Sequence, residues 1–261
     1  MISALRLSSA RPPWRIAASN GAPARAFIGL LCLWWLLLLL FYAFPEIDIY
    51  VSTHFFVRQS CKTAAAALGE NCGYFPYRRE TYLRLIRIFL FRLPYIIALV
   101  MIWKLAACYW HSGATFNVAR ARALKIALGS LIIGPVILVN FVLKAYSGRP
   151  RPWQTLDFGG HLDFVQAGSM AGRCTKNCSF ISGEAAGAGW IFCLIFLIPQ
   201  PARSALALPL IAISFLSPAI RVAFGAHYLS DAILGWLLSV VVFTGLLALT
   251  VSPQGEKKSE I

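Results

Sequence analysis

Three short stretches of the chain contain residue types that could together transfer a phosphoryl group. In the last stretch, Arg221 is followed by five residues and then His227, and Asp231 lies four positions beyond His227. Residues four apart share one face of a helix, so we expect Asp231 to accept a hydrogen bond from one ring nitrogen of His227. The other nitrogen is then unprotonated and can attack phosphorus, which predicts a covalent phosphohistidine.

The other two stretches offer cations and backbone N–H groups. Six residues separate Lys144 from Arg151-Pro152, and Arg149 lies between them. We expect Lys144 and Arg151 to bind phosphate oxygens, with Arg149 supporting the site from behind. Ser182-Gly183 precedes a hydrophobic run, where glycine allows close approach of the backbone and a helix N-terminus presents N–H groups to an oxyanion. Such a set of donors can stabilise the negative charge that develops on the phosphate oxygens in the transition state.

Hydrophobic runs must position these stretches. The chain has 261 residues and is 59% hydrophobic, which is too apolar for a soluble domain. Most of the runs are long enough to cross ~30 Å of hydrocarbon. We expect the second run to extend backwards past Arg84 and forwards past Lys104, and the fourth is shorter than the rest. The six runs are Ala26–Phe44, Leu93–Trp103, Ile126–Leu143, Ala185–Pro199, Ser204–Ile220 and Ala232–Val251.

The prediction is therefore an all-α protein, a polytopic bundle of six transmembrane helices over residues 26–251. Basic residues favour the cytoplasmic side, which assigns residues 1–25 and 252–261 to cytoplasmic tails. The loops 45–83, 145–182 and 221–228 then lie on the outer side. The first run has no Ala-x-Ala cleavage site, so we expect it to remain as the first span. The basic residues that set this orientation include Arg6, Arg11, Arg15, Arg25, Arg120, Arg122, Lys125, Arg203, Lys257 and Lys258.

Cysteine usage agrees with that orientation. Cys61, Cys72, Cys174 and Cys178 all lie in the outer loops. An even number of cysteines on an oxidising face predicts two disulfides, and 61–72 with 174–178 is the simplest of three pairings. Four free thiols are the alternative. A zinc site is disfavoured because the chain has no Cys-x-x-Cys or His-x-x-x-His pair.

Partners follow from the charge and its distribution. The formal net charge is +14, but the cations are scattered over both membrane faces and form no basic aromatic stripe, which argues against nucleic acid. Anionic membrane lipids and a phosphorylated lipid substrate account for the positive charge. We expect no cofactor and no metal, and no obligate protein partner is evident.

The three stretches, in this order, resemble the signature of the type 2 phosphatidic acid phosphatases, the PAP2 superfamily, over roughly residues 85–250. The resemblance rests on Lys-x6-Arg-Pro, Ser-Gly-x and Arg-x5-His-x3-Asp. It implies a six-helix membrane bundle that hydrolyses a phosphomonoester or diphosphate without metal, with its site on the periplasmic face of a bacterial inner membrane. By position it implies His227 as the nucleophile and Asp231 as its orienter. It assigns phosphate binding to Lys144, Arg151, Arg221, Ser182 and Gly183.

The chain departs from this signature at two places. The family usually has Pro-Ser-Gly-His, whose His protonates the leaving group, whereas this chain has Ile181-Ser182-Gly183-Glu184. The family also usually has Ser before the arginine of the third stretch, where this chain has Ile220. Glu184 is either the catalytic acid, protonated once substrate binds, or a contact for Arg or a substrate hydroxyl. In the second case another group, for which His161 is a candidate, supplies the proton.

The expected substrate is an amphiphile, because the site lies at the bilayer surface. The loop Asp157–Cys178 has room for a headgroup larger than glycerol, and the resemblance with its Glu variant favours a lipid A phosphatase. Phosphatidic acid, phosphatidylglycerol phosphate and undecaprenyl diphosphate remain alternative substrates. A phosphotransferase that uses the same phosphohistidine is a second alternative, and a non-catalytic relative that binds phospholipid is a third.

Overall fold

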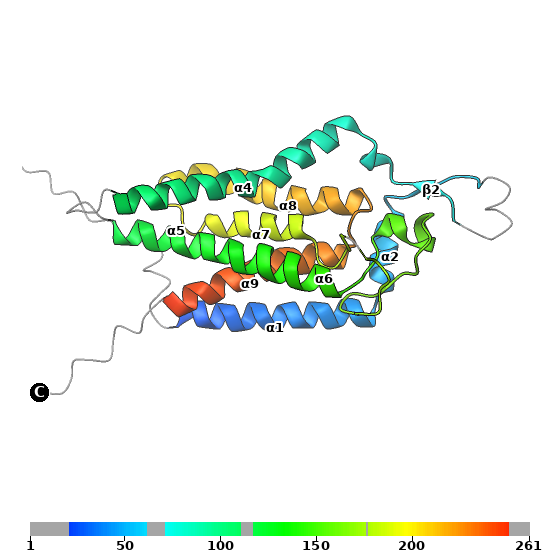
Figure 1. Cartoon of the computed structure of the whole chain (residues 1–261), viewed down its shortest axis with the longest axis horizontal. Helices are drawn as coiled ribbons and strands as arrows, with labels where there is room; N and C mark the ends of the chain where they lie inside the picture. Colours follow the sequence, from blue (N-terminus) through cyan, green and yellow to red (C-terminus); the bar gives the residue numbers. More distant parts are fainter. Residues whose placement is uncertain (1–20, 62–70, 111–116, 176, 251–261) are drawn as a thin grey trace, which may run out of the picture.

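The computed structural model describes residues 21–61, 71–110, 117–175 and 177–250. Its main feature is a bundle in which six helical segments run side by side (Figure 1). The third segment changes from α-helix to π-helix and back. In chain order the segments are α1 (Ala22–Ala43), α4 (Thr81–Trp110), α5 with η3 and α6 (Val118–Leu131, Ile132–Leu143, Lys144–Tyr146), α7 (Gly183–Leu194), α8 (Ala202–Ala223) and α9 (Leu229–Thr250).

Five of these segments are long and apolar enough to cross a membrane: α1, α4, the continuous segment Val118–Tyr146, α8 and α9. The predicted all-α membrane bundle is thereby confirmed. α4 begins before Arg84 and ends beyond Lys104, as expected from the sequence. Pro94 lies inside α4 and removes one backbone donor, which explains the bend of this helix in Figure 1.

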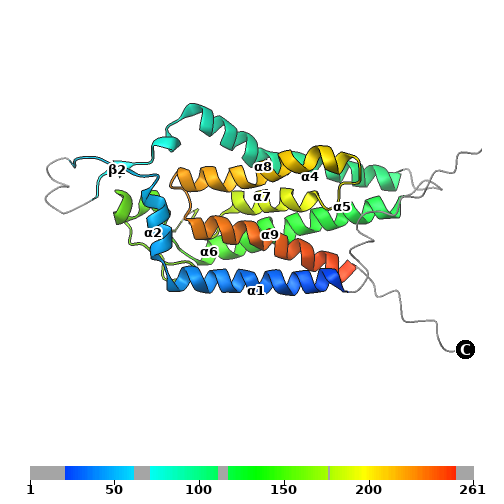
Figure 2. The ribbon, with the colours of Figure 1, turned by 180° about the vertical axis from the view of Figure 1, so that it is seen from behind.

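The fourth expected span, Ala185–Pro199, has a different form. α7 has only 12 residues and ends at Leu194, so its length is about 18 Å and it cannot cross a bilayer alone. It lies in the middle of the bundle between α8 and α9, as both Figure 1 and Figure 2 show. Nearly all of its residues from Ala185 onward are buried. The sixth helix is therefore a short central element surrounded by the longer ones.

Glycine allows α7 and α9 to pack against each other at very short range. A Cβ on Gly189 would lie 2.3 Å from the carbonyl oxygen of Trp236 in α9. A Cβ on Gly235 would lie 2.6 Å from the carbonyl oxygen of Ser182, which precedes α7. Small residues let helix backbones approach in this way. The start of α7 is thus held against the start of α9, where the backbone N–H of Ser182 donates to the Asp231 carbonyl at 3.0 Å.

The connections that carry the motifs gather at one end of the bundle (Figure 1). This end holds α2 (Glu46–Thr53), the small antiparallel pair β1 (Val57–Arg58) and β2 (Gly73–Tyr74), and three 3₁₀ turns. The turns are η2 (Pro76–Arg78), η4 (Pro152–Gln154) and η5 (Leu156–Phe158).

Two disulfides cross-link these connections. The pairs are Cys61–Cys72 and Cys174–Cys178, so the predicted pairing is confirmed. Most of the expected N-terminal tail, 1–20 of 1–25, and the expected C-terminal tail 252–261 lie outside the described residues.

Candidate active site

His227 lies in the short connection between α8 and α9 and is almost fully buried. Its Nδ1 is 2.9 Å from the carbonyl oxygen of Ser179. A carbonyl only accepts hydrogen bonds, so Nδ1 carries the proton and Nε2 keeps a free lone pair. Burial lowers the pKa of His227 to about 3, and the charges of Arg221 and Arg151 act in the same direction, against Asp231. The imidazole is therefore neutral at physiological pH, as a nucleophile must be.

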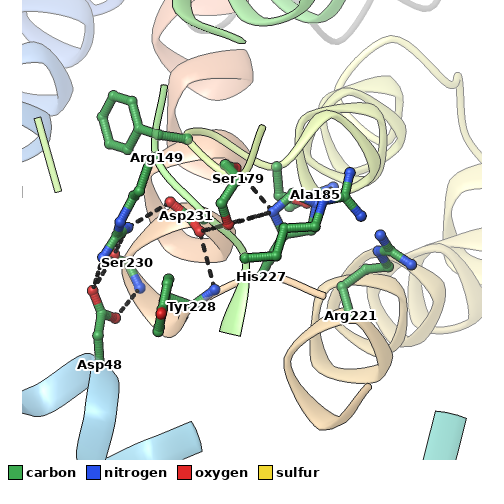
Figure 3. A network of polar contacts seen from close by, with 12 residues as sticks. Asp48, Arg149, Ser179, Ala185, Arg221, His227, Tyr228, Ser230 and Asp231 are labelled. Atoms are coloured by element: carbon green, nitrogen blue, oxygen red, sulfur yellow. Dashed lines mark hydrogen bonds and ion pairs between the residues drawn. The ribbon is translucent and has the colours of Figure 1, made fainter. Parts of the chain in front are cut away.

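Asp231 holds His227 indirectly. The distance from Asp231 Oδ2 to His227 Nδ1 is 3.8 Å, too long for a hydrogen bond, so the predicted direct bond is wrong. The reason is that α9 begins at Leu229, which leaves His227 outside the helical geometry assumed for the pair. Asp231 Oδ2 instead accepts from the Ser179 hydroxyl at 2.5 Å and from the Tyr228 N–H at 3.0 Å (Figure 3). Ser179 therefore links the carboxylate to the imidazole.

Arg149 lies behind Asp231 and is completely buried. Its guanidinium pairs with Asp231 Oδ1 at 2.6 Å and with Asp48 Oδ2 at 2.7 Å (Figure 3). Asp48 also accepts from the backbone N–H of Ser230 at 2.8 Å. Burial works to lower the pKa of Arg149, but Asp231 and Asp48 raise it above its ordinary value. Arg149 thus supports the site from behind, and it ties α2 to the first turn of α9.

Lys144 is the first residue of α6, directly after the π-helical segment, and lies against the start of α7. A Cβ on Gly183 would lie 3.3 Å from Lys144 Nζ and 2.8 Å from the Asn140 side-chain oxygen. Any larger residue at position 183 would therefore displace Lys144 or Asn140. Ser182 caps α7 by accepting from the Ala185 N–H at 3.3 Å. The N–H groups of the first helical residues have no partner within the helix, which makes this end suitable for an anion.

Arg151 and Arg221 add two more buried cations. The Nε–Nη2 edge of Arg151 binds the backbone oxygen of Asn177 at 2.9 Å and its side-chain oxygen at 2.7 Å. Arg221 is in the last turn of α8, and its buried Nε makes no hydrogen bond within the described part of the chain. The Glu184 carboxylate lies close to that Nε, with its Oε1 at 3.4 Å.

Glu184, in the first turn of α7, forms an ion pair with an arginine of α4. Arg87 from α4 donates through Nε and Nη2 to the carboxylate, with the shortest contact at 2.5 Å. The Glu184 side chain is only 8% exposed, and Arg221 lies on its other side. Glu184 therefore lies between two arginines.

A family model described as the PAP2 superfamily matches residues 123–253, which include all three motifs. This chain belongs to the PAP2 superfamily. It is 60% identical over 229 residues to the lipid A 4'-phosphatase of Rhizobium leguminosarum, an alignment that covers 88% of this chain and 98% of that protein. It is 59% identical to the lipid A 4'-phosphatase of Rhizobium etli, covering 90% of this chain and 91% of that protein.

Two further proteins resemble this chain more distantly. The lipid A 4'-phosphatase of Francisella tularensis subsp. novicida is 26% identical over 74% of this chain and 81% of its own length. A solved structure, a PAP2 type phosphatidylglycerolphosphate phosphatase from Bacillus subtilis, superposes with a TM-score of 0.49 at 16% identity. That superposition covers 84% of this chain and 93% of the other.

The three PAP2 stretches therefore meet, although they lie far apart in the sequence. The Ser182 N–H bonds to Asp231, Lys144 lies beside Gly183, and Glu184 lies beside Arg221. His161 is exposed in the connection from α6 to α7, where its backbone N–H donates to the Gln154 carbonyl, and among the described residues no contact joins it to His227. Among the described residues, no group of three His, Cys, Asp or Glu side chains is arranged to hold a metal.

Sequence reasoning missed four residues of this PAP2 site: Asp48, Arg87, Asn140 and Ser179. Two of them carried a usable signal, because an arginine or asparagine within an apolar membrane helix is a candidate functional residue. Arg87 lies in α4 and Asn140 in the π-helical segment. Ser179 lies in a loop and Asp48 in the short helix α2, and the sequence around each shows no pattern that marks a functional residue.

Proposed function

We propose that this protein is a lipid A 4'-phosphatase, an enzyme that removes a phosphate monoester from the sugar headgroup of a membrane glycolipid. The observation that carries the proposal is the 60% identity to a protein of that name across 98% of its length. The site supports it, because the charges of two buried cations, Arg151 and Arg221, act on the neutral, buried His227. A phosphorylated amphiphile at a membrane interface suits this arrangement.

The proposed reaction has two steps. The lone pair of His227 Nε2 forms a bond to phosphorus while the bond from phosphorus to the sugar oxygen breaks, and that oxygen takes up a proton. Water then attacks the phosphohistidine, which releases phosphate and restores the imidazole. Lys144, Arg151 and Arg221 balance the charge that develops on the phosphate oxygens. Asp231 acts through Ser179, whose carbonyl holds the Nδ1 proton in both steps.

For Glu184, the geometry supports the interpretation in which it contacts arginine. A carboxylate held between Arg87 and Arg221 is stabilised in its charged form, which donates no proton. We infer that Glu184 positions these two arginines at the edge of the phosphate site. The proton for the leaving sugar oxygen then comes from another donor.

We propose a bacterial inner membrane as the location, with the site on the periplasmic side. Both disulfides lie at the end of the bundle that holds the site, and disulfides persist in oxidising compartments. Arg120, Lys125 and Arg203 lie near the opposite ends of their helices, where cytoplasmic basic residues are expected.

The proposal is tested with purified protein in detergent and a bisphosphorylated lipid A, in the presence of EDTA. Mass spectrometry should show loss of one phosphate from the 4' position. His227→Gln should lower kcat by at least about 10³-fold, because the covalent route is lost. The variant's Tm should show that it remains folded. Faster turnover of phosphatidic acid or phosphatidylglycerol phosphate than of lipid A would contradict the substrate. Activity of His227→Gln above a few per cent would contradict the phosphohistidine.

A further inference from the structure

A basic cavity lies at the same end of the molecule as His227. Its volume is about 420 Å³, and Arg78, Arg79 and Arg84 line it together with Tyr74 and Trp153. We call it the arginine pocket. η2 and the first turn of α4 supply the arginines, β2 supplies Tyr74, and η4 supplies Trp153.

Aromatic rings hold two of these arginines in place. The guanidinium carbon of Arg78 is 3.8 Å from the centre of the Trp153 ring, and that of Arg79 is 4.0 Å from the centre of the Tyr74 ring. A guanidinium stacked on a ring keeps its N–H donors at its edge, where they can bind a carboxylate or phosphate. Within the described residues, no carboxylate pairs with Arg78, Arg79 or Arg84.

Trp153 connects the arginine pocket to the phosphate site. Arg151 also lies over this ring, with its guanidinium carbon 5.0 Å from the centre. Burial lowers the pKa of Arg151. Attraction to Asp231 and Glu184 opposes that effect, and the weaker repulsion from Arg87 and Arg78 adds to it. One tryptophan ring thus carries a cation of the phosphate site and a cation of the arginine pocket. An anion bound beside Arg78 would offset the repulsion between Arg78 and Arg151.

The pocket walls are held by the two outer loops. The Cys61–Cys72 disulfide lies next to Gly73, which lines the pocket. Gly159, which also lines the pocket, has a φ of +78°, and a Cβ there would lie 3.0 Å from the Asn71 carbonyl oxygen and 3.6 Å from the Gly73 nitrogen. The two loops therefore meet at backbone contact distance, which fixes this wall of the pocket.

We propose that the arginine pocket binds a second anionic group of the same substrate, a phosphate or carboxylate elsewhere on the sugar headgroup. This proposal rests on the function proposed above and adds a preference: the enzyme selects headgroups that carry two anionic groups. The phosphate at His227 reacts, while the group at Arg78 and Arg79 anchors the headgroup. A phospholipid with a single phosphate can occupy only the first site.

The test compares two glycolipids with the same acyl chains, one bisphosphorylated and one that keeps only the reacting phosphate. The wild-type KM should be at least about tenfold lower for the bisphosphorylated lipid, because charge-assisted hydrogen bonds contribute to its binding. In Arg78→Gln/Arg79→Gln the ratio of the two KM values should fall to nearly one, through a rise for the bisphosphorylated lipid. Arg173→Gln, an exposed arginine of the other outer loop, is the control for surface charge and should keep the wild-type ratio.

Three results would overturn the proposal. The first is equal wild-type KM values for the two glycolipids. The second is a double variant that keeps the wild-type ratio. The third is a double variant that raises both KM values equally, which would show only a general attraction of the arginines for anionic lipids. If added anionic phospholipid abolishes the wild-type preference, the pocket binds a membrane headgroup instead of the substrate. Binding of both glycolipids to His227→Gln, measured by calorimetry, makes the same comparison without turnover. Failure of hydrolysis and failure of the pocket are therefore separate results.

Discussion

In the proposed reaction, the proton on Nδ1 of His227 leaves Nε2 as the atom that attacks phosphorus. It is held by the carbonyl of Ser179, a backbone atom that no side-chain substitution removes. Asp231 reaches this pair through the Ser179 hydroxyl and is itself neutralised by Arg149. Loss of the Asp231 carboxylate would therefore leave Arg149 without one of its two partners. Arg149 would then keep only its fully buried ion pair with Asp48.

Glu184→Gln tests whether this residue donates a proton. We expect kcat to stay within about tenfold of wild type, since Glu184 holds Arg87 and Arg221 and is charged between them. The loss should be equal for the lipid phosphate and for an aryl phosphate whose phenol leaves without a proton. Both kcat values are measured with purified protein. A loss of about 10²-fold that disappears with the aryl phosphate would restore Glu184 as the acid.

His227 should also make the stability of the protein depend on pH. Its pKa is about 3 in the folded state, lowered by burial from the ordinary 6.5. As pH falls below 6.5, the unfolded chain binds a proton that the folded protein excludes, so the free energy of unfolding decreases by up to ~1.4 kcal/mol per pH unit. Between pH 7.5 and 5, the Tm of the wild type should therefore fall more than that of His227→Gln. Parallel Tm curves in the two proteins would contradict a buried neutral His227.

At the scale of elements, α7 is the helix on which the site depends. Its N-terminus carries Ser182, Gly183 and Glu184, and its position is set by close packing against α9. The π-helical segment approaches from the other side and brings Lys144 and Asn140 to Gly183. π-Helical turns are often found at functional sites. Because α7 is short and central, a small displacement of this helix moves the residues of its first turn that are proposed to bind phosphate.

Gly189→Ala tests the approach of α7 to α9. The added methyl would lie 2.3 Å from the Trp236 carbonyl, so the helices must separate, and we expect a loss of about 1–3 kcal/mol in stability. Activity should fall with it, because Ser182 and Gly183 move with α7. The matched control is Gly29→Ala in α1, where nothing lies within 4 Å of the new Cβ. Alanine there is neutral or stabilises the helix by up to ~1 kcal/mol. Equal Tm values for the two variants in detergent would contradict the close packing.

At the scale of the whole molecule, the two ends of the bundle carry different groups. The site, the arginine pocket and both disulfides lie at one end. At the other end the α5 N-terminus carries Arg120, Arg122 and Lys125, and the connection from α7 to α8 leads to Arg203. In the proposed periplasmic orientation, a substrate in the outer leaflet presents its headgroup to the proposed phosphate site and to the arginine pocket from the same membrane surface.

Reporter fusions test this orientation. Alkaline phosphatase fused after Gly168, in the connection from α6 to α7, should be active, because it requires an oxidising compartment to form its disulfides. The same reporter fused after Gln200, between α7 and α8, should be inactive. Cell extracts expressing each fusion at equal amounts are assayed for hydrolysis of a chromogenic phosphate. The reverse pattern would place the site in the cytoplasm and contradict the periplasmic assignment.

The sequence alone was sufficient for features that depend on local pattern. The lengths of the apolar runs predicted the helices, and the spacing of Lys144, Ser182 and Arg221 with His227 located the three motifs. The two disulfides followed from cysteines that are close in the chain. In each case the physical cause, the period of a helix or the length of hydrocarbon to be crossed, acts on neighbouring residues and is visible in the order of amino acids.

Only the tertiary structure decided how these pieces meet. Asp48 pairs with a residue 101 positions away and Ser179 lies 52 positions from Asp231, so no local period announces either. Arg87 reaches Glu184 only because the bundle brings α4 to the start of α7. The indirect link from Asp231 to His227 likewise depends on where α9 begins. These contacts are determined by the packing of helices that are distant in the chain, and packing is a property of the folded molecule as a whole.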